Sequence, residues 1–247
     1  MNIIGIIPAR YGSTRFEGKP LTVIAGKTMI RRVTEQAMKA AKLSAVAVAT
    51  DDARIAEEVK SFGGTVVMTS ADHLNGTSRC AEAAELLGGN WDAVINIQGD
   101  EPFIHPAQID LLAGLFDDDK TEIGTLVKHL HDISDLDNPN IIKVVLDRQQ
   151  NGMYFSRSPI PHLRGIEPAE RLQRHTFYKH IGIYGYRMNV LRQLVKLEPS
   201  ELELAESLEQ LRWRENGFSI RTALTDLETI SIDVPSDLEK LKAAGLI

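Results

Sequence analysis

Short apolar runs alternate with amphipathic stretches through the first half of the chain. Four runs are apolar at most successive positions, as strands buried on both faces are, and they span Asn2–Pro8, Ala45–Thr50, Thr65–Thr69 and Asp92–Gln98. The stretches between them carry apolar residues along one stripe of a helix, which predicts helices at about Thr28–Lys42, Ala53–Phe62, Thr77–Leu87 and Pro106–Phe116. Strands and helices that alternate in this way indicate βαβ units around a parallel sheet.

The second half of the chain has a different pattern, because its strand-like and helical runs do not alternate regularly. The predicted strands are Gly124–Leu130, Ile141–Asp147, Met153–Phe155, Ile181–Arg187, Ser219–Leu224 and Thr229–Asp233. The predicted helices are Asn189–Lys196, Leu202–Asn216 and a last one from about Pro235. We therefore expect an α/β fold with a Rossmann-like, mostly parallel central sheet flanked by helices and a smaller mixed α+β lobe.

Length and composition fit one domain with a full core. The chain has 247 residues, of which 43% are hydrophobic. We divide this single domain, 1–247, into an α/β part at about 1–120, the mixed lobe at about 121–200 and a return to the core at about 201–247. The formal net charge of -6 does not favour a general nucleic-acid binder.

Cysteine content and the N-terminus bear on location. Cys80 is the only cysteine, so it cannot form an internal disulfide, and we expect it to be a buried helix residue. The apolar run Ile3–Ala9 is too short for a signal peptide or a membrane span. These features predict a cytoplasmic protein without membrane insertion.

A basic, glycine-containing loop follows the first predicted strand. Between Pro8 and Pro20 the loop carries three cations and two glycines, which are Arg10, Arg15, Lys19, Gly12 and Gly18. Backbone N–H groups, guanidinium forks and an ammonium can together wrap a polyphosphate. The loop is not a P-loop, because Ser13 stands where a glycine must precede Gly18-Lys19, and the dinucleotide pattern G-x-G-x-x-G does not follow this strand. On spacing alone, a solvated turn with clustered cations remains an alternative.

Motifs along nearly the whole chain occur in the order of one known family. The loop ends in Gly18-Lys19-Pro20-Leu21, and the later motifs are Ala49-Thr50-Asp51, Thr69-Ser70-Ala71-Asp72-His73, Asn96-Ile97-Gln98-Gly99-Asp100-Glu101-Pro102, Lys143-Val144-Val145-Leu146-Asp147, Tyr154-Phe155-Ser156-Arg157, His180-Ile181-Gly182-Ile183-Tyr184-Gly185-Tyr186 and Leu208-Glu209-Gln210-Leu211. Together they resemble the 3-deoxy-manno-octulosonate cytidylyltransferase family. The resemblance implies a nucleotidyltransferase that moves CMP from CTP to 3-deoxy-D-manno-octulosonate (Kdo), releases diphosphate and serves lipopolysaccharide biosynthesis. It also implies Mg²⁺ as cofactor and a homodimer formed through the sugar-binding lobe.

The resemblance assigns roles residue by residue. Catalytic roles fall on Arg15, Lys19 and Asp100. Nucleotide binding is assigned to Pro8, Ala9, Arg10, Gly12, Ser13, Arg15, Lys19, Ala71, Asp72, Gly76 and Arg79. Sugar binding is assigned to Gln98, Arg157, His180, Tyr184 and Glu209, and the metal carboxylates are Asp100 and Asp233. The chemistry suits these residue types, since carboxylate oxygens bind Mg²⁺ and an acidic sugar needs a cation together with hydrogen-bonding groups.

The sequence leaves open the exact substrate, the catalytic activity and the role of Asp233. Phe16-Glu17 and Asn75-Gly76-Thr77-Ser78 depart from the usual Leu-Pro and Ser-Gly-Thr-Glu of the family. The substrate could be a related acid, either 8-amino-Kdo or a sialic acid, although Lys19-Pro20 favours Kdo because sialate-activating relatives usually carry Lys-Asn there. A catalytically inactive nucleotide-binding regulator is a third hypothesis. Asp233 could instead serve a helix cap, since Pro235 suits a first helical turn.

Overall fold

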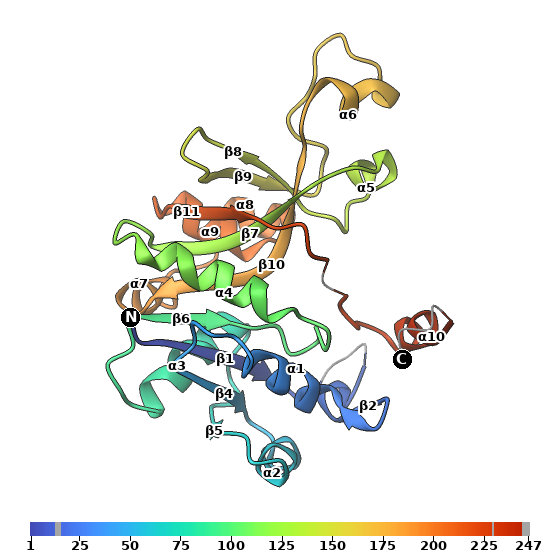
Figure 1. Ribbon diagram of the computed structural model, residues 1–247. Coiled ribbons are helices and arrows are strands. Elements are labelled where there is room, and N and C mark those ends of the chain that lie inside the picture. The colour runs from blue at the N-terminus through green and yellow to red at the C-terminus, as the bar shows by residue number, and fades with distance from the viewer. Residues whose placement is uncertain (13–15, 229, 244–247) are drawn as a thin grey trace. The chain divides into compact units, whose positions relative to one another are not determined.

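The computed structural model describes residues 1–12, 16–228 and 230–243 (Figure 1). The chain divides into two compact units. The first unit contains residues 1–114 and 228–247, and the second contains residues 115–227. None of the described helices has the length and apolar character that crossing a bilayer requires.

The first unit is built on a parallel sheet with the strand order β6, β1, β4, β5. These strands are β1 (Ile3–Ala9), β4 (Ala45–Thr50), β5 (Val66–Met68) and β6 (Ala93–Asn96). Ile4 of β1 lies beside Ala45 on one side and beside Val94 on the other. Apolar residues on both faces of β1 are buried, as the continuous apolar pattern predicts.

Helices cover this sheet. They are α1 (Met29–Ala37), α2 (Ala53–Ser61), α3 (Gly76–Leu86) and α4 (Pro106–Gly114). The last helix, α10 (Pro235–Ala243), packs through Leu241 in one apolar cluster with Ile24 and Met29. α1 contacts α2 and α4, whereas α3 packs on β1, β4, β5 and β6. Right-handed crossovers place α1 and α3 on opposite faces of the sheet. The predicted burial of Cys80 is confirmed, because it lies in α3 with no exposed surface.

The loop after β1 leads into two small elements. A 3₁₀ turn spans Lys19–Leu21 and is followed by a hairpin of β2 (Val23–Ile24) and β3 (Lys27–Thr28). Both central residues of the hairpin turn have positive φ, 44° at Ala25 and 80° at Gly26. A two-residue type I′ turn needs this geometry. Gly26 therefore lies in the turn of the hairpin, and Lys27 and Thr28 form its second strand.

The second unit has a mixed sheet. Its strands are β7 (Ile123–His129), β8 (Lys143–Leu146), β9 (Gly152–Ser156), β10 (Tyr178–Arg187) and β11 (Ile220–Leu224). β11 is parallel to β7, whereas β7 with β10, β10 with β8 and β8 with β9 are antiparallel. The helices are α5 (Ile133–Asp137), α6 (Arg171–Arg174), α7 (Met188–Leu194), α8 (Glu201–Glu206) and α9 (Glu209–Glu215), and two 3₁₀ turns span Leu115–Asp117 and Pro168–Glu170.

The α/β class is confirmed, and two predicted elements are wrong. The helix predicted over Leu202–Asn216 is two helices, because Ser207 ends α8 in the left-handed conformation with φ 51° and ψ 51°. The strand predicted over Thr229–Asp233 is absent from its described residues, 230–233. There the N–H groups of Asp233 and Val234 bond to the Asp237 carboxylate, so they cannot enter a ladder.

Candidate functional site

A cavity opens at the carboxyl ends of β1 and β6 in the first unit. Its volume is about 240 Å³, and it is lined by Pro8, Ala9, Arg10, Gly12, Lys19, Pro20, Gln98, Gly99 and Asp100. Open parallel sheets bind ligands at this end of their strands. The structure thus brings five of the residues assigned to nucleotide binding together with Gln98 and Asp100. Ser13 and Arg15 of the same prediction lie outside the described residues.

Lys19 links the two carboxylates that were assigned to a metal. Its Nζ lies 2.8 Å from Oδ2 of Asp100 and 3.4 Å from Oδ1 of Asp233. The Lys19 side chain is 16% exposed and that of Asp233 is 42% exposed, so the group lies at a partly open surface. The side chain of Asp233 points to this cluster, while its backbone N–H is bonded to Asp237 at the start of α10. Two carboxylates with one ammonium leave one negative charge to attract a cation.

Glu101 adds a third carboxyl group that the sequence assignment missed. It is 6% exposed, and its Oε2 has no hydrogen-bond partner among the described residues. Burial, followed by the charges of Asp100 and Asp233, raises the pKa of Glu101 to about 8. Near neutral pH the Glu101 carboxyl group is therefore mainly protonated, so it adds little negative charge to that of Asp100 and Asp233. Its position directly after Asp100 was the signal available in the sequence.

The loop after β1 is held by Tyr11, another residue that the sequence assignment omitted. The Tyr11 carbonyl accepts a hydrogen bond from Gly18 N–H at 2.9 Å. The guanidinium carbon of Arg54 lies 3.3 Å from the centroid of the Tyr11 ring. Gly18 has φ 68°, a conformation that favours glycine, and a Cβ there would lie 3.2 Å from the same ring. No described residue lies within 4 Å of a Cβ placed on Gly12, so a ligand can approach its backbone closely.

The nucleotide-binding residues assigned within 71–79 lie around the start of α3. Ala71 and Asp72 are exposed, whereas Arg79 is 1% exposed. Arg79 Nη1 donates to Thr69 Oγ1 at 2.7 Å, and its Nη2 lies 3.4 Å from Asp51 Oδ2. Arg79 therefore has a structural role in fixing the ends of β4 and β5, whichever contacts it makes with a ligand.

Gly76 and His73 fix the same segment against the sheet and α3. A Cβ on Gly76 would lie 3.2 Å from Pro8 Cγ, so glycine lets the first turn of α3 approach the end of β1. His73 Nε2 lies 2.5 Å from Glu82 Oε2, and its Nδ1 lies 3.1 Å from Ser78 Oγ. The hydrogen bond from His73 lowers the pKa of Glu82. Ser78, where the family usually has Glu, thus takes part in anchoring the loop.

The remaining residues assigned to the sugar lie in the second unit, with His180 and Tyr184 adjacent on β10. Their ring centroids are 5.1 Å apart, on either side of an irregularity in the register of β10 with β7. The Thr125 hydroxyl donates to Ile183 O at 2.7 Å, so its oxygen accepts from His180 Nε2 at 2.9 Å. Burial lowers the pKa of His180 to about 3. His180 is therefore neutral, with Nδ1 as its acceptor atom.

Tyr184 buries a hydroxyl without a partner among the described residues. The residue is 8% exposed, and burial, together with the charges of Tyr186 and Glu209, raises the pKa of Tyr184 well above its ordinary value. Trp213 packs edge-on against its ring, with centroids 5.0 Å apart. Such a hydroxyl can donate to a bound polar group at no cost to an existing bond.

Arg157 and Glu209 border the junction between α8 and α9. Arg157 donates to the carbonyl oxygens of Glu206 at 2.7 Å, Pro139 at 3.0 Å and Ser207 at 3.3 Å. These bonds use three of the five N–H donors of a guanidinium and fix its plane. Glu209 begins α9 and lies close enough to Tyr184 to affect its pKa. Four of the five predicted sugar residues therefore lie in one unit, whereas Gln98 lies in the other.

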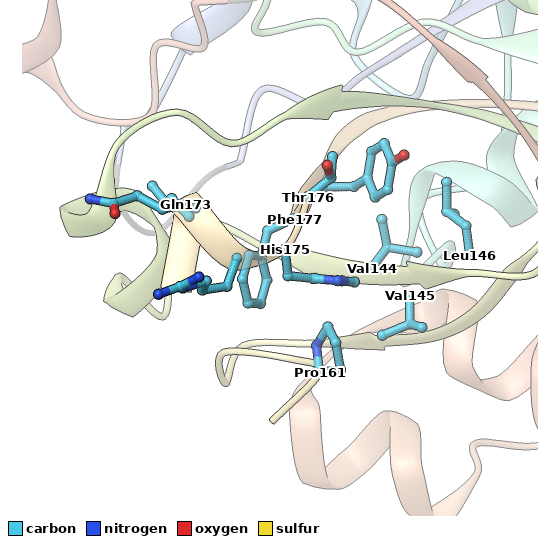
Figure 2. A pocket seen from close by; sticks show the side chains of 11 residues that line it. Val144, Val145, Leu146, Pro161, Gln173, His175, Thr176 and Phe177 are labelled. Atoms are coloured by element: carbon cyan, nitrogen blue, oxygen red, sulfur yellow. The ribbon is translucent and has the colours of Figure 1, made fainter. Parts of the chain in front are cut away.

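A larger cavity in the second unit contains none of the assigned residues. Figure 2 shows this cavity of about 500 Å³ beside β8 and the start of β10. Its lining is Val144, Val145, Leu146, Pro161, Leu172, Gln173, Arg174, His175, Thr176, Phe177 and Tyr178. Seven of the assigned residues, among them Lys19 and Asp100, line the smaller cavity instead, so size alone does not identify the candidate site.

Known proteins resemble this chain over nearly its full length. The model of a family described as Cytidylyltransferase matches residues 4–230. The chain is 55% identical to 3-deoxy-manno-octulosonate cytidylyltransferase of Parabacteroides distasonis, covering 98% of both chains. It is 53% identical to the protein of that name from Bacteroides thetaiotaomicron, covering 97% of this chain and 96% of that one. A solved structure of CMP:2-keto-3-deoxy-manno-octonic acid synthetase complexed with CTP has 41% identity and a TM-score of 0.91, and covers 99% of this chain and 98% of that chain.

Proposed function

Because the chain belongs to the 3-deoxy-manno-octulosonate cytidylyltransferase family, we propose that it transfers CMP from CTP to Kdo and releases diphosphate. This reaction activates Kdo for lipopolysaccharide biosynthesis. The observation that carries the proposal is the cluster of Lys19, Asp100 and Asp233 beside the cavity after β1. A phosphate-binding loop with two carboxylates suits nucleotidyl transfer, and the substrate follows from the relatives that share half of the sequence.

The loop residues would hold the triphosphate. The sugar hydroxyl attacks the α-phosphorus in line, so negative charge grows on the departing diphosphate and needs cations where it develops. Lys19 lines the cavity and has its ammonium at the mouth beside Asp100, while Arg10 is exposed on the same lining. Backbone N–H groups near Gly12 can approach phosphate oxygens because its Cβ position is open. We also assign Arg15 and Ser13 to this group, on the family resemblance.

Asp100 and Asp233 would hold Mg²⁺. The donor set fits this ion, because it consists of carboxylate oxygens that already share one cation, Lys19. Within the described residues no group of three or more His, Cys, Asp and Glu side chains could hold a metal. Mg²⁺ commonly uses one or two carboxylates and completes its shell with substrate phosphates and water. When bound, it would neutralise phosphate charge and lower the pKa of the attacking hydroxyl.

The second unit would supply the contacts with the acidic sugar. Arg157 has two N–H donors beyond those in its three bonds to carbonyl oxygens, and a guanidinium suits a carboxylate. His180 Nδ1 can accept from a sugar hydroxyl and Tyr184 can donate to one. Glu209 at the start of α9 can accept from another. Gln98, which lines the cavity of the first unit, is assigned to the sugar on the family resemblance.

Diphosphate release with a panel of acidic sugars tests this function. The protein is incubated with CTP, Mg²⁺ and Kdo, 8-amino-Kdo or a sialic acid, and diphosphate is followed by a coupled assay. We expect release with Kdo that EDTA abolishes. Preferential diphosphate release with 8-amino-Kdo or with a sialic acid would identify that acid as the substrate instead of Kdo. If the protein binds CTP but releases no diphosphate with any acid, a nucleotide-binding regulator is the better account.

We further propose a cytoplasmic homodimer. The support is the family resemblance and, for location, the use of CTP together with a single buried cysteine, Cys80. Light scattering coupled to gel filtration measures the mass directly. A mass twice that of the 27.4 kDa chain is expected, and a mass near that of one chain contradicts the dimer.

A further inference from the structure

The start of α10 fixes the backbone that carries Asp233. Asp237 Oδ2 accepts hydrogen bonds from the N–H groups of Asp233 at 3.0 Å and Val234 at 3.1 Å. Pro235 is the first residue of α10 and Asp237 the third, so the acid reaches back to the residues before the helix as in a capping box. The capping role that the sequence left open for Asp233 therefore belongs to Asp237. Asp233 keeps its own carboxylate for Lys19.

The segment before α10 is also bonded to the backbone of the other carboxylate residue. Ile232 N–H donates to Asp100 O at 2.9 Å. This bond and the two bonds to Asp237 hold three successive N–H groups, at Ile232, Asp233 and Val234. The Asp233 side chain is 42% exposed, so surrounding packing does little to restrict it. The direction of this side chain toward Lys19 consequently depends on the fixed backbone as well as on its contact with the Lys19 ammonium.

An apolar cluster ties α10 to the other segments of the site. Its buried members are Ile24, Met29, Ile232 and Leu241, and the partly buried Phe16, Phe103 and Leu238 pack against them. Leu238 and Leu241 come from α10. Phe16 comes from the phosphate loop, Phe103 follows Asp100 by three residues, and Ile232 precedes Asp233. One cluster thus joins α10 to the segments that carry both carboxylates and Lys19.

We propose that Asp237 is a positioning residue for divalent-cation binding, and that α10 is the element through which it acts. The inference rests on the proposed function, because it assumes that Asp100 and Asp233 share the cation. The Asp237 carboxylate holds the backbone of Asp233 so that both carboxylates face one point. Without this acceptor the two N–H groups turn to water, and the cation loses one preorganised ligand.

Replacement of Asp237 tests the proposal through metal binding without turnover. With CTP present and no sugar, Mn²⁺ binding is followed by the electron paramagnetic resonance signal of free Mn²⁺. We expect Asp237→Ala to weaken Mn²⁺ binding about five- to tenfold, the size of a lost helix-capping bond. In the full reaction, the Mg²⁺ concentration for half-maximal rate rises by the same factor. CTP binding in EDTA stays unchanged, because the phosphate loop is intact.

Two matched variants separate geometry from charge and from general damage to α10. Asp237→Asn removes the charge but keeps an acceptor oxygen, so it restores Mn²⁺ binding to within about twofold of the unsubstituted protein. Glu239→Ala removes an acid from the same helix whose ion pair with Lys242 is exposed, and it leaves Mn²⁺ binding unchanged. If Asp237→Ala does not fold, Asp237→Gln, whose acceptor lies one carbon farther away, replaces it.

The outcomes distinguish this inference from the proposed function. Unchanged Mn²⁺ binding and Mg²⁺ dependence in Asp237→Ala, with an active unsubstituted protein, overturn the positioning role. If Asp237→Asn weakens Mn²⁺ binding as much as Asp237→Ala does, the positioning role is also overturned, because the charge of Asp237 and not its geometry would then matter. If the unsubstituted protein binds Mn²⁺ and CTP but releases no diphosphate with Kdo, the proposed function fails while the positioning role stands.

Discussion

Removal of the Tyr184 hydroxyl should affect stability and sugar binding in opposite directions. Its buried hydroxyl lacks a partner among the described residues, and an unsatisfied buried hydroxyl costs free energy. Tyr184→Phe should therefore leave the free energy of unfolding unchanged or raise it by up to about 1 kcal/mol in urea titrations. If the hydroxyl donates to Kdo, the same variant raises KM for Kdo about five- to tenfold.

The neighbouring Tyr186→Phe is the matched control for this prediction. Tyr186 lies two residues along β10 with its ring stacked 6.2 Å from that of Tyr184, and the sequence assigns it no sugar contact. KM for Kdo should stay unchanged in this variant. An equal rise in both variants would attribute the effect to packing of the strand, and no rise in Tyr184→Phe would remove the hydroxyl from the sugar site.

His180 makes stability depend on pH in a defined window. Its pKa is about 3 in the folded protein because the ring is buried, against about 6.5 in the unfolded chain. The unfolded state then binds more protons between these values, so the stabilisation is complete above about pH 6.5 and is lost as the pH falls toward 3. Between about pH 7.5 and 5.5 this residue should remove roughly 1 kcal/mol of unfolding free energy.

Comparison with His180→Gln isolates that contribution. Gln keeps a donor for Thr125 but does not titrate, so its loss of stability over the same pH range should be smaller by roughly 1 kcal/mol. Chemical denaturation at the two pH values measures the difference. An equal change in unfolding free energy between the two pH values in both proteins would mean that protonation of the imidazole does not destabilise the folded state.

Among the elements, the loop after β1 contains two glycines with different reasons for their presence. Gly18 has φ 68° and faces the Tyr11 ring, so Gly18→Ala should cost about 1–2 kcal/mol of unfolding free energy. Gly12 has no positive φ and no neighbour of its Cβ position among the described residues, so Gly12→Ala should keep full stability. The added methyl group instead meets the triphosphate, and KM for CTP should rise about tenfold.

Steady-state kinetics and thermal unfolding of both variants check this contrast. A destabilised Gly12→Ala protein would indicate that the loop packs more tightly than its open Cβ position suggests. A stable Gly12→Ala protein with unchanged KM for CTP would place the triphosphate away from this backbone.

Sequence patterns predicted the elements of the first unit well because each strand there is continuously apolar. β4 has the predicted bounds, Ala45–Thr50, and helix ends differ by a few residues. The errors fall where a local contact overrides periodicity. The apolar stripe of Leu202–Asn216 continues across Ser207, whose left-handed backbone separates α8 from α9. The run Thr229–Asp233 has strand-like residues, but Asp237 takes the N–H groups that a ladder would need.

The proximity of the assigned residues was predictable where a motif carries them, whereas contacts that tertiary packing creates were not. Asp100 and Asp233 are 133 residues apart in the sequence, and their shared contact with Lys19 matches the assignment of one cluster. Glu101, Tyr11 and Asp237 have no distinctive spacing. Their importance comes from burial, from a ring under Arg54 and from a backward hydrogen bond, none of which a linear pattern contains.

For the molecule as a whole, the assigned chemistry is divided between the two units. The cavity with Lys19 and Asp100 belongs entirely to the first unit, whereas Arg157, His180, Tyr184 and Glu209 belong to the second. This division predicts that CTP binding depends on the first unit and is insensitive to changes in the sugar residues. Ligand-induced stabilisation measures binding without catalysis, because a ligand that binds only the folded state raises its unfolding temperature.

With CTP and Mg²⁺ but no sugar, CTP at about 100 times its Kd should stabilise the protein by roughly 2.7 kcal/mol, a shift of about 5–10 °C. Arg157→Gln should keep this shift even if its own unfolding temperature is lower, because its lost bonds lie in the second unit. Lys19→Ala should reduce the shift to about 1 °C, as a hundredfold weaker affinity requires. Lys39→Ala, which removes an exposed lysine of the first unit, should keep the full shift.

A full shift in Lys19→Ala would exclude Lys19 from the triphosphate site. Loss of the shift in Arg157→Gln would show that CTP binding also depends on the second unit.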